Sequence, residues 1–529
     1  MKPPCDNAVI RAGTAVVPCS AKDNTWILAA TILGSSLAFI DSTVVNVALP
    51  AIQASLNATV VDVQWVVESY GLFLSALILV GGSFGDLFGR RLVFIVGVSI
   101  FAVASAGCGF ASSIDQLIVA RSIQGMGAAL LVPGSLAIIS TSFDEKSRGQ
   151  AIGTWSGFTA ITTAIGPVLG GWLVGHASWR WVFFINSPIA VAVIVISLWF
   201  IPESRSSTAR RVDWIGAMLA TSGLGGLVYG FIESVDLGWR NPLVFGSLFL
   251  GFGCLVAFVF VETRVVDPMV PLTLFKSRPF SGANLLTLLL YAAIGVFFFL
   301  FPLNLIQVQG YSTTATGVAI LPLILLMFFL SRWSGRLVVR FGPRDPLIIG
   351  PIIVAVGFAL FALPSIGGNY WKAFFPAVIA LGFGMALTIA PLTTVVMGSV
   401  DQDRLGAASG INNAVARVAG VLAIAILGIV MVKAFASRLD DGLSRLSLSP
   451  PVLHDLQTNE IKLAGLQVPD ELNSGTKAAI KESVGESFVF GFRIVMSICA
   501  GLSLASAAVA WLMISQKARD SGVTLRVYS

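Results

Sequence analysis

Long apolar runs separated by short polar segments form the main pattern of this chain. Fourteen of these runs are long enough to span the bilayer, because a helix needs about 20 apolar residues to cross about 30 Å of hydrocarbon. The strands of a transmembrane β-barrel would instead alternate polar and apolar positions over about ten residues. The pattern therefore predicts an all-α polytopic membrane protein. The expected spans are residues 25–49, 65–84, 92–111, 115–140, 150–174, 180–201, 213–233, 242–262, 281–306, 316–338, 346–364, 372–397, 406–435 and 488–515.

Composition supports this prediction and excludes a soluble protein. Of the 529 residues, 56% are hydrophobic and only 11% are charged, and the mean hydropathy is +0.88. A soluble domain carries about 25% charged residues, because its whole surface must be wetted by water. The 33 Lys and Arg residues and 27 Asp and Glu residues are too few to cover a water-facing body of this length.

Lysine and arginine are distributed unequally between the two predicted sides of the membrane. If the N-terminus is cytoplasmic, the segments on that side hold twenty basic residues. The short segments on the other side hold only Arg180, Arg240 and Lys372. The positive-inside rule then places both termini in the cytoplasm. We expect the chain to lie in the cell (inner or plasma) membrane. Because the basic residues form no single stripe or tail, we expect no nucleic-acid partner.

A weak internal repeat divides the chain. Gly82 and Gly89 flank a loop. Gly335 follows Gly82 after 253 residues, and Gly342 follows Gly89 after the same interval. Parallel repeats are typical of secondary transporters whose site lies near the middle of the bilayer. We therefore expect two six-helix bundles with an inserted helix pair. The expected parts are a cytoplasmic tail (1–25), an N-terminal bundle (26–201), a linker with two extra helices (202–279), a C-terminal bundle (280–515) with a long external loop (437–487), and a second tail (516–529).

The external loop 437–487 is polar and rich in serine, and two interpretations stay open for it. It is either a solvated connection with some helix or a functional cap.

Three charged side chains fall within the predicted spans of the N-terminal half. Asp41 lies in the first span, where an acid must be paired, hydrated or neutralised. Because burial favours the neutral form of a carboxyl, Asp41 is a candidate proton carrier. Arg121, in the fourth span, keeps its charge and needs a partner; Asp41 is the leading candidate. Glu68, early in the second span, is a second candidate carrier. The alternatives are a permanent structural Asp41–Arg121 salt bridge and a Glu68 that is solvated at the outer mouth.

The loop between the second and third spans combines glycines, an acid and two arginines. We expect it to gate the transport pathway, with the acid facing a helix N-terminus or an arginine of the other half. The alternative is a tight turn whose positive charges only hold it inside. The gating residues are Gly82, Asp86, Gly89, Arg90 and Arg91.

The fifth span carries a proline among glycines, in the motif Gly166, Pro167, Gly170 and Gly171. Proline kinks a helix and glycine lets a neighbouring helix approach closely, so this motif is either functional or a packing kink.

The second half of the chain has polar residues within its predicted spans but no deep acid. Proton coupling is therefore expected in the N-terminal half. The candidate substrate-cavity residues are Asn46, Gln124, Asn412, Asn413 and Arg417.

Enzymatic and ATP-driven chemistry find little support in the sequence. The two histidines, His176 and His454, both fall outside the predicted spans. The five cysteines have no metal-ligand spacing, and no phosphate-binding glycine loop is present. We expect no catalytic residues, no metal and no cofactor.

These motifs resemble the major facilitator superfamily, in particular its fourteen-span drug:H⁺ antiporter branch. The resemblance covers about residues 26–515 and is carried by the Asp41–Pro50 stretch, the Gly82–Arg91 loop, Arg121–Gly127 and Gly166–Gly171. It implies the fold of that family, export of lipophilic or cationic compounds in exchange for protons, and a coupling role for Asp41 and Arg121. The chain departs from the family pattern at Leu87, Val339 and Thr162.

The expected function is proton-coupled export of amphipathic or cationic drugs by alternating access. Its partners are then a small-molecule substrate, protons and the lipid bilayer. One alternative is a dedicated exporter of a single metabolite, lipid or amino acid. A remote alternative is a membrane-embedded enzyme.

Overall fold

The computed structural model is built from long helices, and its described residues contain no strand. The structure describes residues 21–143, 145–205, 213–266, 268–400, 405–446, 448–466, 468–469 and 472–514. The N-terminal helices are α2 (Ala21–Leu56), α3 (Val60–Phe88), α4 (Arg90–Phe110), α5 (Ile114–Ser142), α6 (Glu145–His176), α7 (Trp181–Phe184) and α8 (Asn186–Phe200). The inserted pair is α9 (Trp214–Glu233) and α10 (Pro242–Glu262). The C-terminal elements are η1 (Leu272–Lys276), α11 (Arg278–Leu303), η2 (Asn304–Val308), α12 (Thr313–Phe341), α13 (Arg344–Phe361), α14 (Tyr370–Ala373), α15 (Phe375–Gly398), α16 (Leu405–Leu443), α17 (Pro450–Thr458), η4 (Glu460–Gly465) and α18 (Ser474–Met513).

The all-α membrane fold is confirmed. Thirteen helical stretches of the described chain are long and apolar enough to cross a membrane. The helix α6, with 32 residues, is a further long helix and packs against α2 and α12. Fourteen spans, with α6 as the additional one, stay a prediction. Two details differ: the predicted span 180–201 is divided into α7 and α8 at Ile185, and the helix of the last predicted span begins at Ser474.

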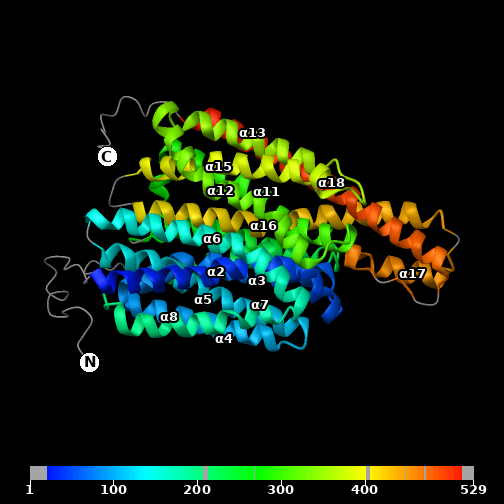
Figure 1. Cartoon of the computed structure of the whole chain (residues 1–529), viewed down its shortest axis with the longest axis horizontal. Coiled ribbons are helices and arrows are strands. Elements are labelled where there is room, and N and C mark those ends of the chain that lie inside the picture. The colour runs from blue at the N-terminus through cyan, green and yellow to red at the C-terminus, as the bar shows by residue number, and fades with distance from the viewer. Residues whose placement is uncertain are drawn as a thin grey trace.

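The helices form two bundles that lie side by side (Figure 1). In the first bundle, α3 and α4 pack on α5, and α2 packs on α6 and α8. In the second bundle, α13 packs on α15 and α18, and α11 packs on α16 and α18. The inserted helix α9 packs on its partner α10 and also on α3 and α16, so it contacts both bundles. The bundles meet mainly where α6 packs on α12 and α3 packs on α16.

Polar caps set where several of these helices begin. The Thr59 hydroxyl accepts from the Asp62 backbone N–H while the Asp62 carboxylate accepts from the Thr59 N–H, a capping box that starts α3. Asn473 caps α18 by accepting from Thr476 N–H at 2.8 Å. Each cap satisfies backbone donors that the first helical turn leaves free.

The segment between α16 and α18 contains the two short helices α17 and η4 in its described part. In Figure 1, α17 projects beyond the bundles, at the end opposite to the start of α2. Three leucines of the segment are nearly inaccessible, Leu456 at 1%, Leu463 at 0% and Leu466 at 7% exposed, and they belong to the main hydrophobic core. The expected solvated loop with some helix therefore describes it incompletely, because its apolar side chains are packed. We call residues 444–473 the external segment.

Candidate functional site

A buried ion pair lies within the first bundle. Arg121 of α5 donates through Nη1 to Asp41 Oδ2 of α2 at 2.5 Å, and both side chains are at most 2% exposed. The pairing expected from the sequence is therefore present. Gln124, one turn after Arg121, links both partners: its Oε1 accepts from Arg121 at 2.7 Å and its Nε2 donates to Asp41 Oδ1 at 2.8 Å. The carboxylate thus has both oxygens occupied by donors, as a buried charge requires.

Polar side chains of α4 and α8 complete the shell of this pair. Asn186 Nδ2 lies 3.4 Å from Asp41 Oδ1 and 3.0 Å from Ser105 Oγ, and both residues are 0% exposed. Sequence reasoning missed Asn186 and Ser105. The available signal was an amide inside an otherwise apolar run, at the point where α7 gives way to α8.

Arg121 is further held by an aromatic ring and a backbone carbonyl. Its guanidinium carbon lies 4.2 Å from the Tyr70 ring centroid, and its Nε donates to Val66 O at 3.1 Å. Both contacts come from α3. Because the arginine is bound to α2, α3 and its own helix, a change in the charge of Asp41 acts on three helices at once.

Glu68 is fully buried, so the solvated mouth-facing alternative is wrong for this conformation. Its side chain is 0% exposed, and neither carboxyl oxygen has a hydrogen-bond partner among the described residues. Gln64, one turn earlier, is 1% exposed and its Nε2 is also unsatisfied. Gly428 of α16 leaves room for Gln64, because a Cβ on that glycine would overlap the amide. Glu68 and Gln64 are thus both unpartnered on α3, and Gln64 lies against a helix of the other half.

The loop between α3 and α4 is folded on its own bundle. Asp86 pairs with Arg90 at 2.7 Å, four residues further along, and the Asp86 side chain is 44% exposed. The expected contact of Asp86 with an arginine of the other half is therefore absent from the described part of this conformation. Gly89 adopts φ +118°, a conformation that favours glycine, and lets the chain turn from α3 into α4.

Glu203, which the sequence analysis did not single out, caps α4. Its carboxylate accepts from the backbone N–H groups of Arg91 and Leu92, both at 3.1 Å, where the positive end of the helix dipole favours an anion. The Arg91 guanidinium donates to Ile201 O at 3.1 Å. The residues after α8 therefore hold the loop between α3 and α4 in place. Gly82, the first glycine of the gating motif, lies near α5, where a Cβ on it would meet Pro133 at ordinary contact distance.

The glycine–proline motif of α6 is a site of close helix approach to two neighbours. A Cβ on Gly166 or Gly170 would press on α2, at Thr43 and Val44 respectively. A Cβ on Gly171 would overlap the Thr313 carbonyl of α12.

The α12 side of this contact is equally tight. A Cβ on Gly317 would overlap the Pro167 carbonyl, which α6 leaves facing α12. The hydroxyls of Thr313 and Thr314 donate to Gly171 O at 2.8 and 3.1 Å. The two bundles are therefore in backbone contact here.

The residues expected to line a substrate cavity do not form one cluster. Gln124 belongs to the ion-pair shell, and Asn46 donates to Ser42 O of its own helix at 3.1 Å. On α16, Asn413 likewise donates to its own helix, at Ser409 O.

Asn412 and Arg417 of α16 have different surroundings. Asn412 donates to Thr287 Oγ1 at 2.8 Å and to Asn284 Oδ1 at 3.2 Å, both on α11. Arg417 is partly exposed and within electrostatic reach of Tyr70, and it makes no hydrogen bond or ion pair with the described residues.

Polar contacts close the end of the bundles that carries the external segment. Gln307 Nε2 of η2 donates to Gln53 Oε1 of α2 at 2.8 Å, and Gln53 Nε2 donates to Lys462 O of η4 at 3.1 Å. Lys462 Nζ donates to Asn57 Oδ1 at 3.1 Å. The external segment thus belongs in sequence to the second bundle but is bound to the first.

In the described ranges, no group of three or more His, Cys, Asp and Glu side chains could hold a metal ion.

Comparison with known proteins agrees with this architecture. The family model described as Major Facilitator Superfamily matches residues 31–424. The chain is 32% identical over 508 residues to the tetracenomycin C resistance and export protein of Streptomyces glaucescens, covering 94% of each chain. It is 32% identical over 512 residues to the multidrug resistance protein Stp of Mycobacterium tuberculosis, covering 94% of this chain and 93% of that protein. A crystal structure of a bacterial homolog to the human lysosomal transporter Spinster has a TM-score of 0.64 at 18% identity, covering 93% of this chain and 98% of the other.

Proposed function

Because the chain belongs to the major facilitator superfamily, we propose that it is a proton-coupled antiporter that exports amphipathic or cationic drugs from the cell. The observation that carries the proposal is the buried Asp41–Arg121 pair with its Gln124 bridge. A membrane helix tolerates such charges only when they are paired, and they mark ion and proton pathways. The pair offers a carboxylate whose charge is balanced by a single neighbouring cation.

The names of the relatives support export of organic compounds. One is named for resistance to and export of tetracenomycin C, and the other for multidrug resistance. The first name favours a dedicated exporter, and the second favours a broad one. Accumulation assays with a panel of dyes and antibiotics separate these functions, because a dedicated exporter moves one compound and ignores the dyes.

We infer that Asp41 takes up a proton from water and releases it again as the protein changes conformation, while Arg121 keeps its charge throughout. When Asp41 is ionised, its negative charge balances the positive charge of Arg121, and their ion pair joins α2 to α5. Protonation removes that attraction and leaves Arg121 held by Gln124 and the Val66 carbonyl. The two charge states then stabilise different arrangements of the helices, which is the requirement for coupling.

We assign Glu68 a second, complementary part in the cycle. An isolated carboxylate without a partner costs several kcal/mol to bury, so Glu68 is expected to carry a proton while α3 packs on α16. It exchanges that proton when the two bundles separate and water reaches it. In the conformation in which α3 packs on α16, therefore, we expect Asp41 to be ionised and Glu68 to be neutral.

Transport in proteoliposomes under an imposed pH gradient tests the proposal, with ethidium as the probe. Asp41→Asn fixes the neutral form with little change of shape. We expect proton-driven net efflux to be lost, while exchange of ethidium across the membrane survives better. Asp115→Asn, at the exposed start of α5, is the matched control and is expected to transport normally.

A second readout separates coupling from folding. Ethidium should release protons from the purified wild-type protein, and less from Asp41→Asn. If Asp41→Asn keeps wild-type net efflux and proton release, Asp41 is structural and the proposal for it fails. Glu68→Gln should lower proton release if Glu68 is a carrier, and wild-type release from this variant would remove that role.

A further inference from the structure

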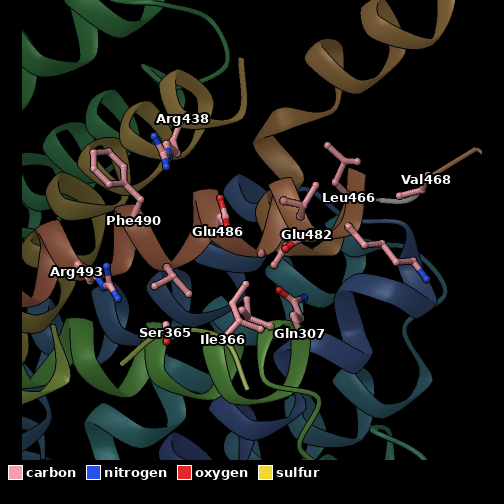
Figure 2. Close-up of a pocket in the computed structure, with 16 residues that line it drawn as sticks. Gln307, Ser365, Ile366, Arg438, Leu466, Val468, Glu482, Glu486, Phe490 and Arg493 are labelled. Carbon is pink, nitrogen blue, oxygen red and sulfur yellow. The ribbon is translucent and has the colours of Figure 1, made fainter. Parts of the chain in front are cut away.

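A cavity of about 890 Å³ lies beside α18 at the end of the bundles that carries the external segment (Figure 2). Its volume falls within the range of about 300–1,000 Å³ that small-molecule sites occupy. The walls come from η2, the connection after α13, the end of α16, the external segment and the first half of α18. None of the polar groups used in the proposed coupling mechanism lines this cavity.

One wall of the cavity combines two carboxylates with an aromatic ring. Glu482, Glu486 and Phe490 follow one another at intervals of four residues, so they form a stripe on one face of α18 (Figure 2). Both glutamates are exposed, and neither forms an ion pair with any described residue. Apolar side chains such as Ile366 and Leu466 form other parts of the wall.

Two of the three cations in the lining already have partners in the protein. Arg493 Nη2 donates to the carbonyls of Leu363 and Pro364 at 3.0 and 3.1 Å. The Arg438 guanidinium lies 5.9 Å from the Phe490 ring centroid. Lys481 is the remaining cation and is exposed. None of these three cations forms an ion pair with Glu482 or Glu486, so both carboxylates are free to contact a positively charged group from outside the chain.

The cavity adjoins the contacts that join the two bundles. Gln307 lines the cavity and also donates to Gln53 of the first bundle. Ala464, another lining residue, precedes Gly465, at which a Cβ would meet the Gln53 amide at about 2.9 Å. A compound in the cavity would touch residues of the outer closure itself.

We propose that this cavity is an external binding site for amphipathic organic cations, in which Glu482 and Glu486 take the charge and Phe490 with the apolar wall takes the ring system. The choice of organic cations as the ligand class rests on the proposed export function. Carboxylates beside an aromatic face bind an organic cation through charge and through the ring quadrupole.

Two ions of nearly equal shape and opposite charge, tetraphenylphosphonium and tetraphenylborate, test the site. The probe position is Ser365→Cys, an exposed residue of the cavity wall, labelled from outside with a membrane-impermeant maleimide in proteoliposomes. Wild-type protein gives the background from its native cysteines. We expect tetraphenylphosphonium to slow the labelling several-fold and tetraphenylborate to leave it unchanged.

Charge variants then locate the effect. In the Ser365→Cys background, Glu482→Gln with Glu486→Gln should raise the tetraphenylphosphonium concentration needed for protection about tenfold, because two ion contacts are lost. Asp441→Asn with Asp455→Asn removes the same charge from exposed positions that do not line the cavity, and protection should stay at the parent level.

Equal protection by both ions, or unchanged protection in the Glu482 and Glu486 variant, overturns the proposal. Labelling is measured without a pH gradient, so it does not depend on transport. Protection without drug efflux would contradict the proposed function and leave the site standing. Efflux without protection would contradict the site alone.

Discussion

Gln307 of η2 donates a hydrogen bond to Gln53 of α2, with 2.8 Å between Nε2 and Oε1, although 254 residues separate them in the chain. The contact joins the two bundles at the end where the external segment lies. Gln53 also donates to the Lys462 carbonyl of that segment, so one side chain connects three parts of the protein. In the proposed alternating-access cycle the bundles separate at this end, and these contacts then break.

A short cross-link at this position should lock the transporter. Gln53→Cys with Gln307→Cys is expected to be bridged by a short bis-methanethiosulfonate reagent and then to lose efflux of ethidium, and reduction should restore efflux. A reagent is used because the hydrogen-bonded ends of two glutamines leave a gap that two cysteines alone would not span. Electrophoresis after treatment and transport assays on the same sample measure both effects. Each single cysteine variant is the control and should transport after treatment. Full transport by the cross-linked protein would mean that this end does not open.

The packing of α6 on α12 predicts a sharp effect of one methyl group. Gly171→Ala places a Cβ against the Thr313 carbonyl, and overpacking of this kind costs about 1–3 kcal/mol. We expect a lower melting temperature and slower efflux. Gly153→Ala on the same helix has no neighbour within 4 Å and gains the same helix propensity, so it should be neutral or stabilising. Equal behaviour of the two variants would contradict the close contact.

The Asp41–Arg121 pair predicts that two substitutions are less harmful to folding than one. Arg121→Gln leaves Asp41 without its cation, and breaking a buried pair costs about 3–5 kcal/mol. Arg121→Gln combined with Asp41→Asn leaves no unpaired charge. Thermal unfolding in detergent should show that the double variant recovers most of the stability. Its proton-driven efflux should stay absent, and recovered efflux would assign the pair a structural role only.

The loop after α3 predicts a variant with normal stability and poor transport. The Asp86–Arg90 pair is exposed enough to contribute only about 0–1 kcal/mol, so Asp86→Asn should leave the melting temperature unchanged. If Asp86 contacts the other bundle in the opposite conformation, turnover in proteoliposomes should fall sharply. Asp345→Asn, at the start of α13, is the control. Normal turnover of Asp86→Asn would reduce the loop to a turn that sets topology.

The external segment should dock more firmly at acidic pH. Burial raises the pKa of Glu460, and the nearby Asp440 raises that pKa further. A carboxyl whose pKa is raised by folding opposes the folded form once it ionises. Docking is therefore strongest below the ordinary value of about 4.3 and weakens as the pH rises through the raised pKa. Hydrogen exchange of residues 450–465, compared at each pH with Glu460→Gln, should show this dependence in the wild type only. The same dependence in the variant would assign it to another group.

Features that depend on local pattern could be predicted from the sequence. The apolar runs fixed the helical spans, because crossing the hydrocarbon requires a certain length of apolar helix whatever its neighbours are. The need of Arg121 for a partner followed from the permanent charge of arginine, and Asp41 was the leading candidate in the same half. The close approach at Gly166–Gly171 followed from the residue types alone.

Features that depend on how helices rotate and slide against one another needed the tertiary structure. From its position near the start of a span, Glu68 could be an acid that faces the outer mouth. The packing of α3 on other helices instead makes its side chain inaccessible to solvent. The donors around Asp41 come from α5 and α8, the Gln53–Gln307 bond joins the two bundles, and the external cavity joins segments more than a hundred residues apart. A sequence gives the period of each helix, but the partners of a polar side chain depend on the register of packing between helices. That register is set by the shapes of all the contacting side chains together.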